Sequence, residues 1–399
     1  MKIYKKNNVY EEAYLRISRL FEEFTNVVVG ISGGKDSSVV YDIAYRIAKK
    51  KKRLPLNVMW LDQEAEWQGT VDTVTKIMND PNVNPFWLQI PMELTNNANT
   101  TDRYSFAWHK DNSEDWIHPQ VDISIKDNVY GTSRFHDIFR AFMKYHFPNE
   151  KSCYVAGMRT EESPMRLLAL TQNLTYKDIT WGKTLDKNLG HYTFYPIYDW
   201  SYTDVWKYLH SNNVEYNPVY DAMYQQGVSI RDMRISNLHH ETAIQNLMLV
   251  QEIEPKTWNR ISNRIKGANT IKHIRGNSFK CPKKLPYMFS SWREYAYFLA
   301  EKIAGESEYY DKLISTIQKY EKIYDGDNIK DMFYKKVIDT VLASDFDFTK
   351  LSNWTTQGAG FSYKRFKQGK YLRQMLADRA CFTDKELQIL LEGIKNNEK

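Results

Sequence analysis

The chain has 399 residues, of which 42% are hydrophobic and 14% aromatic, and its formal net charge is +6. This composition favours a packed core over a disordered chain. No apolar stretch approaches the roughly 18–20 residues that span a bilayer, and none follows the basic start of the chain, so we expect a cytoplasmic protein with no membrane segment. The cysteines Cys153, Cys281 and Cys381 lie far apart, which excludes a disulfide scaffold and four-cysteine zinc or iron–sulfur sites within one chain.

The first part of the chain alternates strand and helix patterns. Residues 26–31 form a β-branched, continuous run, typical of a strand buried on both faces of a parallel sheet. Apolar residues then recur at helical spacing from Asp36 onward. Further strands are expected at 56–61, 85–90 and 153–157, helices at 70–78 and 135–146, and an irregular insertion at 95–130. The pattern predicts an α/β fold with a doubly wound, mostly parallel sheet that binds ligands at the carboxyl ends of its strands.

Beyond residue 227 strand patterns are scarce. Helical patterns are expected at 241–252, 258–266, 292–303, 309–323, 330–342 and 384–394. We therefore divide the chain into a nucleotide-binding domain, 1–227, and a mainly helical C-terminal domain, 228–399.

Residues 32–38 lie between the first strand and the first helix and have the features of a phosphate-binding loop. Adjacent glycines let the backbone approach a phosphate, and the helix N-terminus adds partial positive charge. Lys35 supplies a full charge. Asp36 would repel phosphate unless a cation bridged them, so it implies Mg²⁺ with Asp36 as a metal ligand. The nucleotide-binding candidates here are Ser32, Gly33, Gly34, Lys35, Asp36, Ser37 and Ser38.

The loop lacks the spacing of the Walker motif. Residues 32–37 instead resemble, at all six positions, the PP-loop signature of the N-type ATP pyrophosphatases, a group that includes the phosphoadenosine phosphosulfate (PAPS) reductases. The resemblance implies an adenine nucleotide alpha-hydrolase-like fold and cleavage of ATP between its α- and β-phosphates. A glycine-rich turn without function is the alternative.

A second motif follows the strand at 153–157. Its residues Gly157, Arg159, Ser163 and Arg166 resemble the family motif that closes over the nucleotide phosphates from the opposite side. Both arginines offer forked donors suited to phosphate oxygens. Surface ion pairs of these arginines with the glutamates at 161 and 162 are the alternative. The catalytic candidates are Lys35, Asp36, Arg159 and Arg166.

Two further regions extend the resemblance. Asp62 follows the second strand and matches the family's acidic position, where it is expected to contact the ribose, the adenine or the metal. Residues 195–209 and 216–220 resemble segments of the PAPS-reductase group that we interpret as mainly architectural, bordering the substrate cleft. Ser201 or Thr203 is expected to cap the helix that follows.

The cysteines depart from the reductase pattern. PAPS reductases use a nucleophilic cysteine in a C-terminal motif, and none follows Tyr220 in the corresponding region. Cys281 has basic neighbours that would lower its pKa but lacks the motif, and Cys153 is interpreted as a buried structural thiol. The lysine–aspartate pair of the loop also favours ATP over a sulfonucleotide. We therefore predict an ATP pyrophosphatase that binds ATP and Mg²⁺ and adenylylates an unknown acceptor, rather than a thiol-dependent reductase.

The second half adds a resemblance and two alternatives. Residues 233–235, 252–258 and 263–269 resemble a branch that joins a PAPS-reductase-like domain to a helical domain of unknown function, including the immunoglobulin-binding regulator A proteins of bacteria and prophages. That branch implies a ParB-like partner protein.

Residues 228–399 carry 29 Lys and Arg against 21 Asp and Glu, and residues 363–371 interleave cations with aromatic side chains. Nucleic acid is therefore a candidate partner, and an ordinary solvated surface is the alternative interpretation. The alternative functions are a non-catalytic, nucleotide-binding transcriptional co-regulator associated with DNA, and a sulfonucleotide reductase or transferase.

Overall fold

The computed structural model describes residues 6–95, 104–171, 175–235, 237–238, 244–265, 281–305, 308–324, 327–342, 345, 348–356 and 360. The chain forms two compact units. The first comprises Met1–Thr95 and Tyr104–Ala268, and the second comprises Asn96–Arg103 and Asn269–Lys399.

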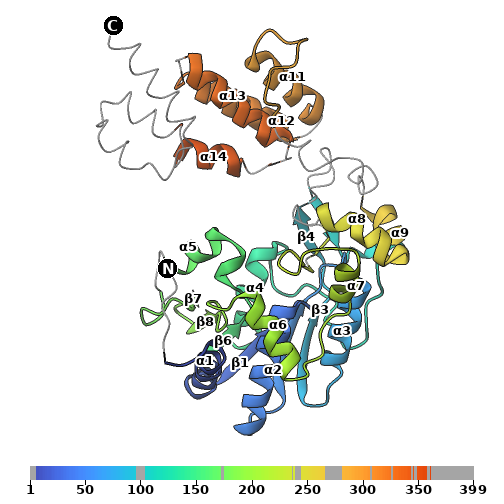
Figure 1. Ribbon diagram of the computed structural model, residues 1–399, viewed down its shortest axis with the longest axis vertical. Helices are drawn as coiled ribbons and strands as arrows, with labels where there is room; N and C mark the ends of the chain where they lie inside the picture. The colour runs from blue at the N-terminus through green and yellow to red at the C-terminus, as the bar shows by residue number, and fades with distance from the viewer. Residues whose placement is uncertain are drawn as a thin grey trace. The chain divides into compact units, whose positions relative to one another are not determined.

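A six-stranded sheet forms the centre of the first unit (Figure 1). Its strand order is β3-β2-β1-β6-β8-β7, and each adjacent pair is parallel except β7 with β8. The strands are β1 (Asn26–Gly30), β2 (Leu56–Leu61), β3 (Val83–Leu88), β6 (Ser152–Val155), β7 (Gly182–Asp186) and β8 (His191–Phe194). The predicted doubly wound, mostly parallel sheet is confirmed.

Helices cover both faces of this sheet. Side chains alternate between the faces along each strand, so Val27 and Val29 join one core cluster and Val28 joins another. The first cluster is shared with α1 (Val9–Glu23), α2 (Lys35–Lys50), α3 (Gln68–Met78) and α6 (Tyr202–Ser211), and the second with α4 (Phe135–His146). Apolar cover on both faces explains why the central strands read as continuous hydrophobic runs.

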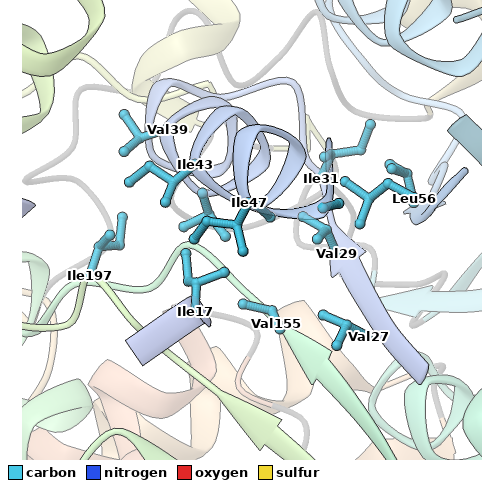
Figure 2. Close-up of a cluster of buried hydrophobic side chains, with 14 of the residues drawn as sticks. Ile17, Val27, Val29, Ile31, Val39, Ile43, Ile47, Leu56, Val155 and Ile197 are labelled. Atoms are coloured by element: carbon cyan, nitrogen blue, oxygen red, sulfur yellow. The ribbon is translucent and has the colours of Figure 1, made fainter. Parts of the chain in front are cut away.

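The first core cluster packs α2 onto the sheet (Figure 2). Ile43 and Ile47 of α2 are fully buried beside Val29 and Val155 of the strands, and Ile17 of α1 closes the cluster. Truncating any one of these three isoleucines to alanine would cost roughly 2–5 kcal/mol. This packing fixes the position at which α2 begins, and with it the loop that precedes the helix.

Several smaller elements complete the first unit. The strand β5 lies within the region predicted as an irregular insertion and pairs with β4, which ends where that region begins. The antiparallel pair β7–β8 is not among the predicted strands. The elements are β4 (Met92–Thr95), β5 (Tyr104–Ala107), the 3₁₀ helices η1 (Lys110–Asp115) and η2 (Thr160–Glu162), α5 (Pro164–Thr171), α7 (Val219–Gln225), α8 (Ile244–Ile253) and α9 (Pro255–Arg264). Ser201 caps α6, because its hydroxyl accepts a hydrogen bond from Asp204 N.

Residues beyond the predicted domain boundary belong to this first unit as well. Leu238 N donates to Ala65 O at 2.9 Å, and the Glu254 carboxylate accepts hydrogen bonds from Gln68 N and Gly69 N at the start of α3. The compact unit therefore reaches Ala268, and a functional division at 227/228 stays a prediction.

The second unit is helical in its described part. Small residues of α11 (Trp292–Ala304) let it pack closely on α13 (Asp327–Leu342), and aromatic side chains such as Tyr324 and Phe333 fill the core. The other helices are α12 (Glu308–Glu321) and α14 (Thr349–Thr356). The helix predicted at 384–394 and the basic segment 363–371 lie outside the described residues. Among the helices that are described, none is long and apolar enough to cross a membrane.

The strand order creates a switch point between β1 and β6. From β1 the chain moves outward through β2 to β3, and then returns to place β6 on the other side of β1. In open α/β sheets, ligands bind at the carboxyl ends of the strands where the order reverses. The loops after β1 and β6 are those that carry the two predicted motifs.

Candidate functional site

The loop between β1 and α2 requires glycine at residue 33 and is tightly packed at Gly34. Gly33 has φ +67°, and a Cβ atom at this position would lie 2.6 Å from Thr70 Cγ2. A Cβ atom on Gly34 would lie 3.3 Å from the hydroxyl of Tyr220. A side chain at residue 33 would therefore force the turn away from α3.

The serines of this loop hold its backbone. Ser37 Oγ accepts a hydrogen bond from Ser32 N at 3.1 Å and donates one to Gly34 O at 2.9 Å. Ser38 Oγ donates to the same carbonyl at 3.1 Å. Gly34, as the N-cap of α2, offers no side chain to cap the helix. The turn thus presents a helix N-terminus without a side-chain cap, a geometry that favours anions.

Lys35 is almost fully buried, with 3% of its surface exposed. Its Nζ lies 3.2 Å from the Asp36 carboxylate and donates to Met233 O at 3.3 Å, while its backbone N donates to the Tyr220 hydroxyl at 3.1 Å. Burial lowers the pKa of Lys35, Asp36 opposes that shift, and the charge of Arg159 adds to it. The ammonium group is therefore short of compensating negative charge.

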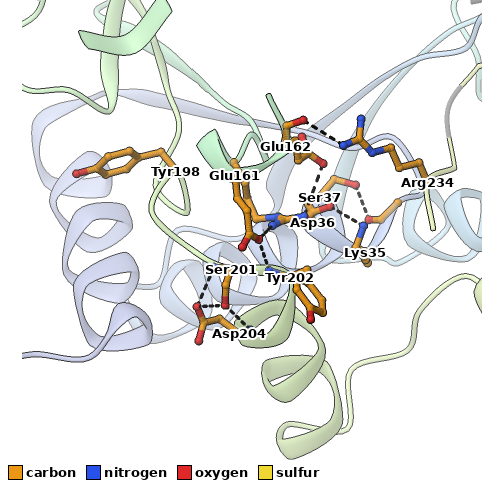
Figure 3. A network of polar contacts seen from close by, with 12 residues as sticks. Lys35, Asp36, Ser37, Glu161, Glu162, Tyr198, Ser201, Tyr202, Asp204 and Arg234 are labelled. Atoms are coloured by element: carbon orange, nitrogen blue, oxygen red, sulfur yellow. Dashed lines mark hydrogen bonds and ion pairs between the residues drawn. The ribbon is translucent and has the colours of Figure 1, made fainter. Parts of the chain in front are cut away.

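The second motif meets the loop at Asp36 (Figure 3). Arg159 is 3% exposed, and its Nε donates to Asp36 Oδ1 at 2.5 Å. Its other nitrogens lie 2.9 Å from Glu161 and 3.7 Å from Glu162. Gly157 makes this approach possible, because a Cβ atom there would lie 2.7 Å from the Asp36 carbonyl carbon. The structure therefore brings together the two predicted motifs, and it also forms the arginine–glutamate pairs of the alternative interpretation.

Arg166 lies at the edge of this cluster. It forms an ion pair with Glu162, and its side chain is 42% exposed. Burial lowers its pKa, and the neighbouring charges of Arg234 and Arg159 lower it further. Ser163 accepts the backbone hydrogen bond of Arg166 N at 3.0 Å and so begins α5. Arg234, which the sequence did not suggest, donates to Glu162 O at 3.1 Å.

The donor set for magnesium is a single carboxylate. Within the described residues, no three His, Cys, Asp or Glu side chains converge to hold a metal ion. Asp36 alone carries a carboxylate in the loop, and both of its oxygens face cations. Mg²⁺ commonly binds through one or two carboxylates together with substrate phosphates. The residues therefore fit a magnesium ion that arrives with a nucleotide, and not one held by the protein alone.

Asp62 lies apart from the phosphate loop contacts. Its carboxylate is fully buried and accepts hydrogen bonds from Trp87 Nε1 at 2.9 Å, Gln89 Nε2 at 3.0 Å and Glu64 N at 3.0 Å. His118 Nε2 lies 3.3 Å from the same carboxylate. These contacts favour a structural role, and a contact of Asp62 with the nucleotide stays a prediction.

Two further acidic residues after β2, Glu64 and Glu66, are not among the predicted site residues. Glu64 is fully buried and pairs with Arg264 of α9 through contacts of 2.7 and 3.1 Å. Glu66 is 6% exposed, and burial together with the charge of Asp62 raises its pKa well above its usual value. The alternation of Asp62, Glu64 and Glu66 after the strand was a usable signal. The partner of Glu64, however, is Arg264, which lies 200 residues away in the chain.

The segment 216–220 contacts the loop more closely than an architectural interpretation implied. Asn217 is fully buried, and its side-chain amide donates to Gly33 O at 3.3 Å and to Thr70 Oγ1 at 2.9 Å. Tyr220 receives the Lys35 backbone hydrogen bond, and its ring lies 5.3 Å from Lys35 Nζ. Both residues position the phosphate loop.

The described cysteines are poor nucleophiles. Cys153 is fully buried in β6, and burial raises its pKa well above the usual value. Cys281 belongs to the second unit, where burial and then Asp339 raise its pKa to about 12. The charges of Lys335 and Lys336 lower the pKa of Cys281, but burial and Asp339 outweigh them, so the net lowering expected from basic neighbours does not occur. Cys381 lies outside the described residues.

Comparison with known families identifies the lineage. Residues 26–227, just over half of the chain, match the phosphoadenosine phosphosulfate reductase domain. The chain belongs to the PAPS reductase domain family. Residues 227–370 match a domain of unknown function, DUF3440, so the predicted combination of a PAPS-reductase-like domain with a C-terminal domain of unknown function is confirmed. Membership in the PAPS reductase domain family supports binding of a nucleotide, without specifying which one.

Individual relatives within and around this family are distant. An uncharacterized protein of Escherichia coli strain K12, YbdN, is 26% identical over 341 residues, 81% of this chain and 83% of that protein. Adenosine 5'-phosphosulfate reductase of Anoxybacillus flavithermus is 32% identical over 74 residues, 18% of this chain and 27% of that enzyme. The crystal structure of PAPS reductase from Candida auris, as a phosphate complex, aligns with 60% of this chain and 98% of that one, at 12% identity and a TM-score of 0.32.

Proposed function

We propose that this protein binds ATP with Mg²⁺ and opens the bond between the α- and β-phosphates to adenylylate an acceptor. One observation carries the proposal: Lys35 and Arg159 both contact Asp36 at the N-terminus of α2, where the strand order of the sheet reverses. Cations from two loops and a helix N-terminus converge there, and this combination suits a polyphosphate.

The triphosphate would replace carboxylates as the partner of these cations. Lys35, Arg159 and Arg166 are paired with Asp36 and Glu162 in the ligand-free protein. Phosphate oxygens offer more charge than those carboxylates, and a Mg²⁺ ion held by Asp36 and the phosphates would offset the remaining repulsion. The lowered pKa of Lys35 indicates that its ammonium gains from added negative charge.

The chemical step follows from charge placement. A nucleophile of the acceptor forms a bond to the α-phosphorus, while the bond from that phosphorus to the bridging oxygen breaks and pyrophosphate leaves with its electrons. The cations stabilise the charge on the leaving group, and the loop holds the phosphates in line. The acceptor supplies the nucleophile, and its proton passes to solvent or to the acceptor's own base.

The raised pKa values of the described thiols favour adenylylation over sulfonucleotide reduction. Reduction of a sulfonucleotide by this family's reductases needs a reactive thiolate, and the pKa values of Cys153 and Cys281 are both raised. Cys153 is also sealed in the core of the sheet. Among the described cysteines, neither is suited to attack a bound nucleotide.

Lysine variants of α2 test the proposal. Lys35→Ala removes the loop cation, and Lys49→Ala removes an exposed cation from the last turn of the same helix. We expect release of pyrophosphate from Mg–ATP, measured with added cellular protein and nucleic acid as acceptors, to fall at least about 100-fold in the first variant and to stay unchanged in the second. Equal release by both variants and by the wild-type protein would show that the loop does not carry the reaction.

The proposed partners go beyond this site. A ParB-like protein and a nucleic acid remain predictions of the sequence, as does a cytoplasmic location. The basic segment 363–371, on which the nucleic-acid prediction rests, lies outside the described residues.

A further inference from the structure

The turn after α7 returns over the phosphate loop. Met233 is 2% exposed, and its carbonyl accepts the hydrogen bond of Lys35 Nζ. The next residue, Arg234, has an exposed side chain that donates to the Glu162 carbonyl at 3.1 Å. Figure 3 shows this side chain extending toward Glu162 beside Lys35 and Asp36. Two consecutive residues thus contact both halves of the candidate phosphate site.

Arg234 adds to an excess of positive charge. Within the described residues, the cluster holds four cations and three carboxylates: Lys35, Arg159, Arg166 and Arg234, with Asp36, Glu161 and Glu162. The charge of Arg234 contributes, after burial, to the lowered pKa values of Lys35 and Arg166. A fourth cation at this position increases the repulsion among the cations of the cluster, and a bound polyanion would relieve that repulsion.

We infer that Arg234 is a phosphate-binding residue that contacts the β,γ-pyrophosphate of a nucleoside triphosphate. This inference rests on the proposed function and adds a residue from the segment matched by the C-terminal domain of unknown function. The first residues of that domain therefore complete a site built by the PAPS reductase domain. Arg234 lies close enough to Lys35 and Arg166 for its charge to act on both. A contact of Arg234 with the pyrophosphate would therefore discriminate triphosphates from monophosphates.

A purely structural role makes a different prediction. If Arg234 only satisfies the Glu162 carbonyl, its loss weakens the fold slightly and leaves the relative affinities for different nucleotides unchanged. A phosphate-binding role changes affinity selectively: ligands with a pyrophosphate group lose affinity, and AMP does not.

The experiment compares Arg234→Gln with Arg231→Gln in the full chain. Arg231 is exposed on the same turn and has no polar side-chain contact within the described residues, so it controls for loss of one surface charge. Affinities for Mg–ATP, inorganic pyrophosphate and AMP are measured by calorimetry, and thermal unfolding of the free proteins checks the fold. Arg234→Lys separates charge from the forked geometry of arginine.

We expect Arg234→Gln to bind Mg–ATP and pyrophosphate about tenfold more weakly, with AMP affinity and thermal stability unchanged. Arg231→Gln should match the wild-type protein, and Arg234→Lys should lie between the two. Unchanged Mg–ATP and pyrophosphate affinities in Arg234→Gln, or an equal loss for all three ligands, would overturn the inference. If the wild-type protein binds pyrophosphate in an Arg234-dependent manner but never cleaves ATP, the inference holds and the proposed function fails. If the wild-type protein binds neither Mg–ATP nor pyrophosphate, both fail.

Discussion

Gly157 lies directly against the backbone of Asp36. A Cβ atom on Gly157 would come within 2.7 Å of the Asp36 carbonyl carbon and 2.8 Å of Ser37 N. This close approach lets Arg159, two residues further on, reach the Asp36 carboxylate. The contact between the two motifs therefore depends on the absence of a side chain at residue 157.

Gly157→Ala should separate the two loops. The added methyl group meets backbone rather than a flexible side chain, so Asp36 or Gly157 must shift. We expect at least about a tenfold loss of Mg–ATP affinity, measured by calorimetry, because the cations no longer converge. Gly227→Ala is the control: its φ of +80° strains alanine, but no atom lies within 4 Å, so it should lose stability without losing affinity. Wild-type affinity in Gly157→Ala would argue against convergence of the loops on the ligand.

Asp36→Asn should affect metal-free and metal-bound ligands in opposite directions. The carboxylate of Asp36 competes with phosphate for Lys35 and Arg159. Its neutralisation should tighten binding of pyrophosphate in EDTA by about three- to tenfold and abolish the gain in affinity that Mg²⁺ provides. Asp72→Asn, at an exposed position on α3, should change neither. A variant at Asp36 that keeps the full effect of Mg²⁺ would remove Asp36 as the metal ligand.

Arg264→Met should destabilise the protein strongly. It leaves the fully buried Glu64 carboxylate without its cation, and breaking a buried pair in this way costs about 3–5 kcal/mol. Urea unfolding measures the loss, and adding Glu64→Gln should recover part of it. Lys110→Ala breaks an exposed pair with Asp127 and should cost less than about 1 kcal/mol. A similarly small effect of Arg264→Met would mean that α9 does not belong to the cooperative core of the first unit.

His118 should make stability depend on pH. Burial opposes its protonation, but the Asp62 carboxylate 3.3 Å away, with smaller contributions from Pro119 and Glu64, outweighs burial and raises the pKa of His118 above 6.5. A pKa raised in the folded state gives stability that is present below pH 6.5 and lost as the pH rises through the folded value. The raised pKa of Glu66 acts in the same sense, because the stability it contributes is present below pH 4.5 and is lost as the pH rises through the folded value. The free energy of unfolding should therefore fall above pH 6.5, and His118→Gln should flatten that slope; equal slopes in both proteins would exclude His118 as its source.

The sequence could predict the elements whose signals are local. The run at 26–31 and the spacing from Asp36 specify a strand, a loop and a helix without reference to the rest of the chain. The pairing of β7 with β8 could not be predicted in this way, because both strands are short and only half-buried, so they lack a continuous apolar run. The place of β8 beside β6, and of β7 at the edge of the sheet, comes from tertiary contacts.

In the candidate site, too, the residues with local signals could be predicted, and the contacts between distant segments could not. Its glycines and cations are visible as motifs, but the contacts of Tyr220 with Lys35 and of Arg234 with Glu162 join residues far apart in the chain. Asp62 shows which contacts a local pattern leaves out. Its position after β2 suggested a ligand contact, yet the side chains that enclose it come from β3 and the following insertion. Burial of a polar side chain by distant segments leaves no local pattern.

The most direct measurement identifies the products of ATP cleavage by mass spectrometry. The full chain is incubated with Mg–ATP and cellular protein and nucleic acid as candidate acceptors, and Lys35→Ala serves as the blank. Opening between the α- and β-phosphates predicts pyrophosphate in amounts equal to AMP, free or attached to an acceptor, and no ADP. Formation of ADP with orthophosphate, or ATP that stays intact in the wild-type protein as in the blank, would contradict the proposed function.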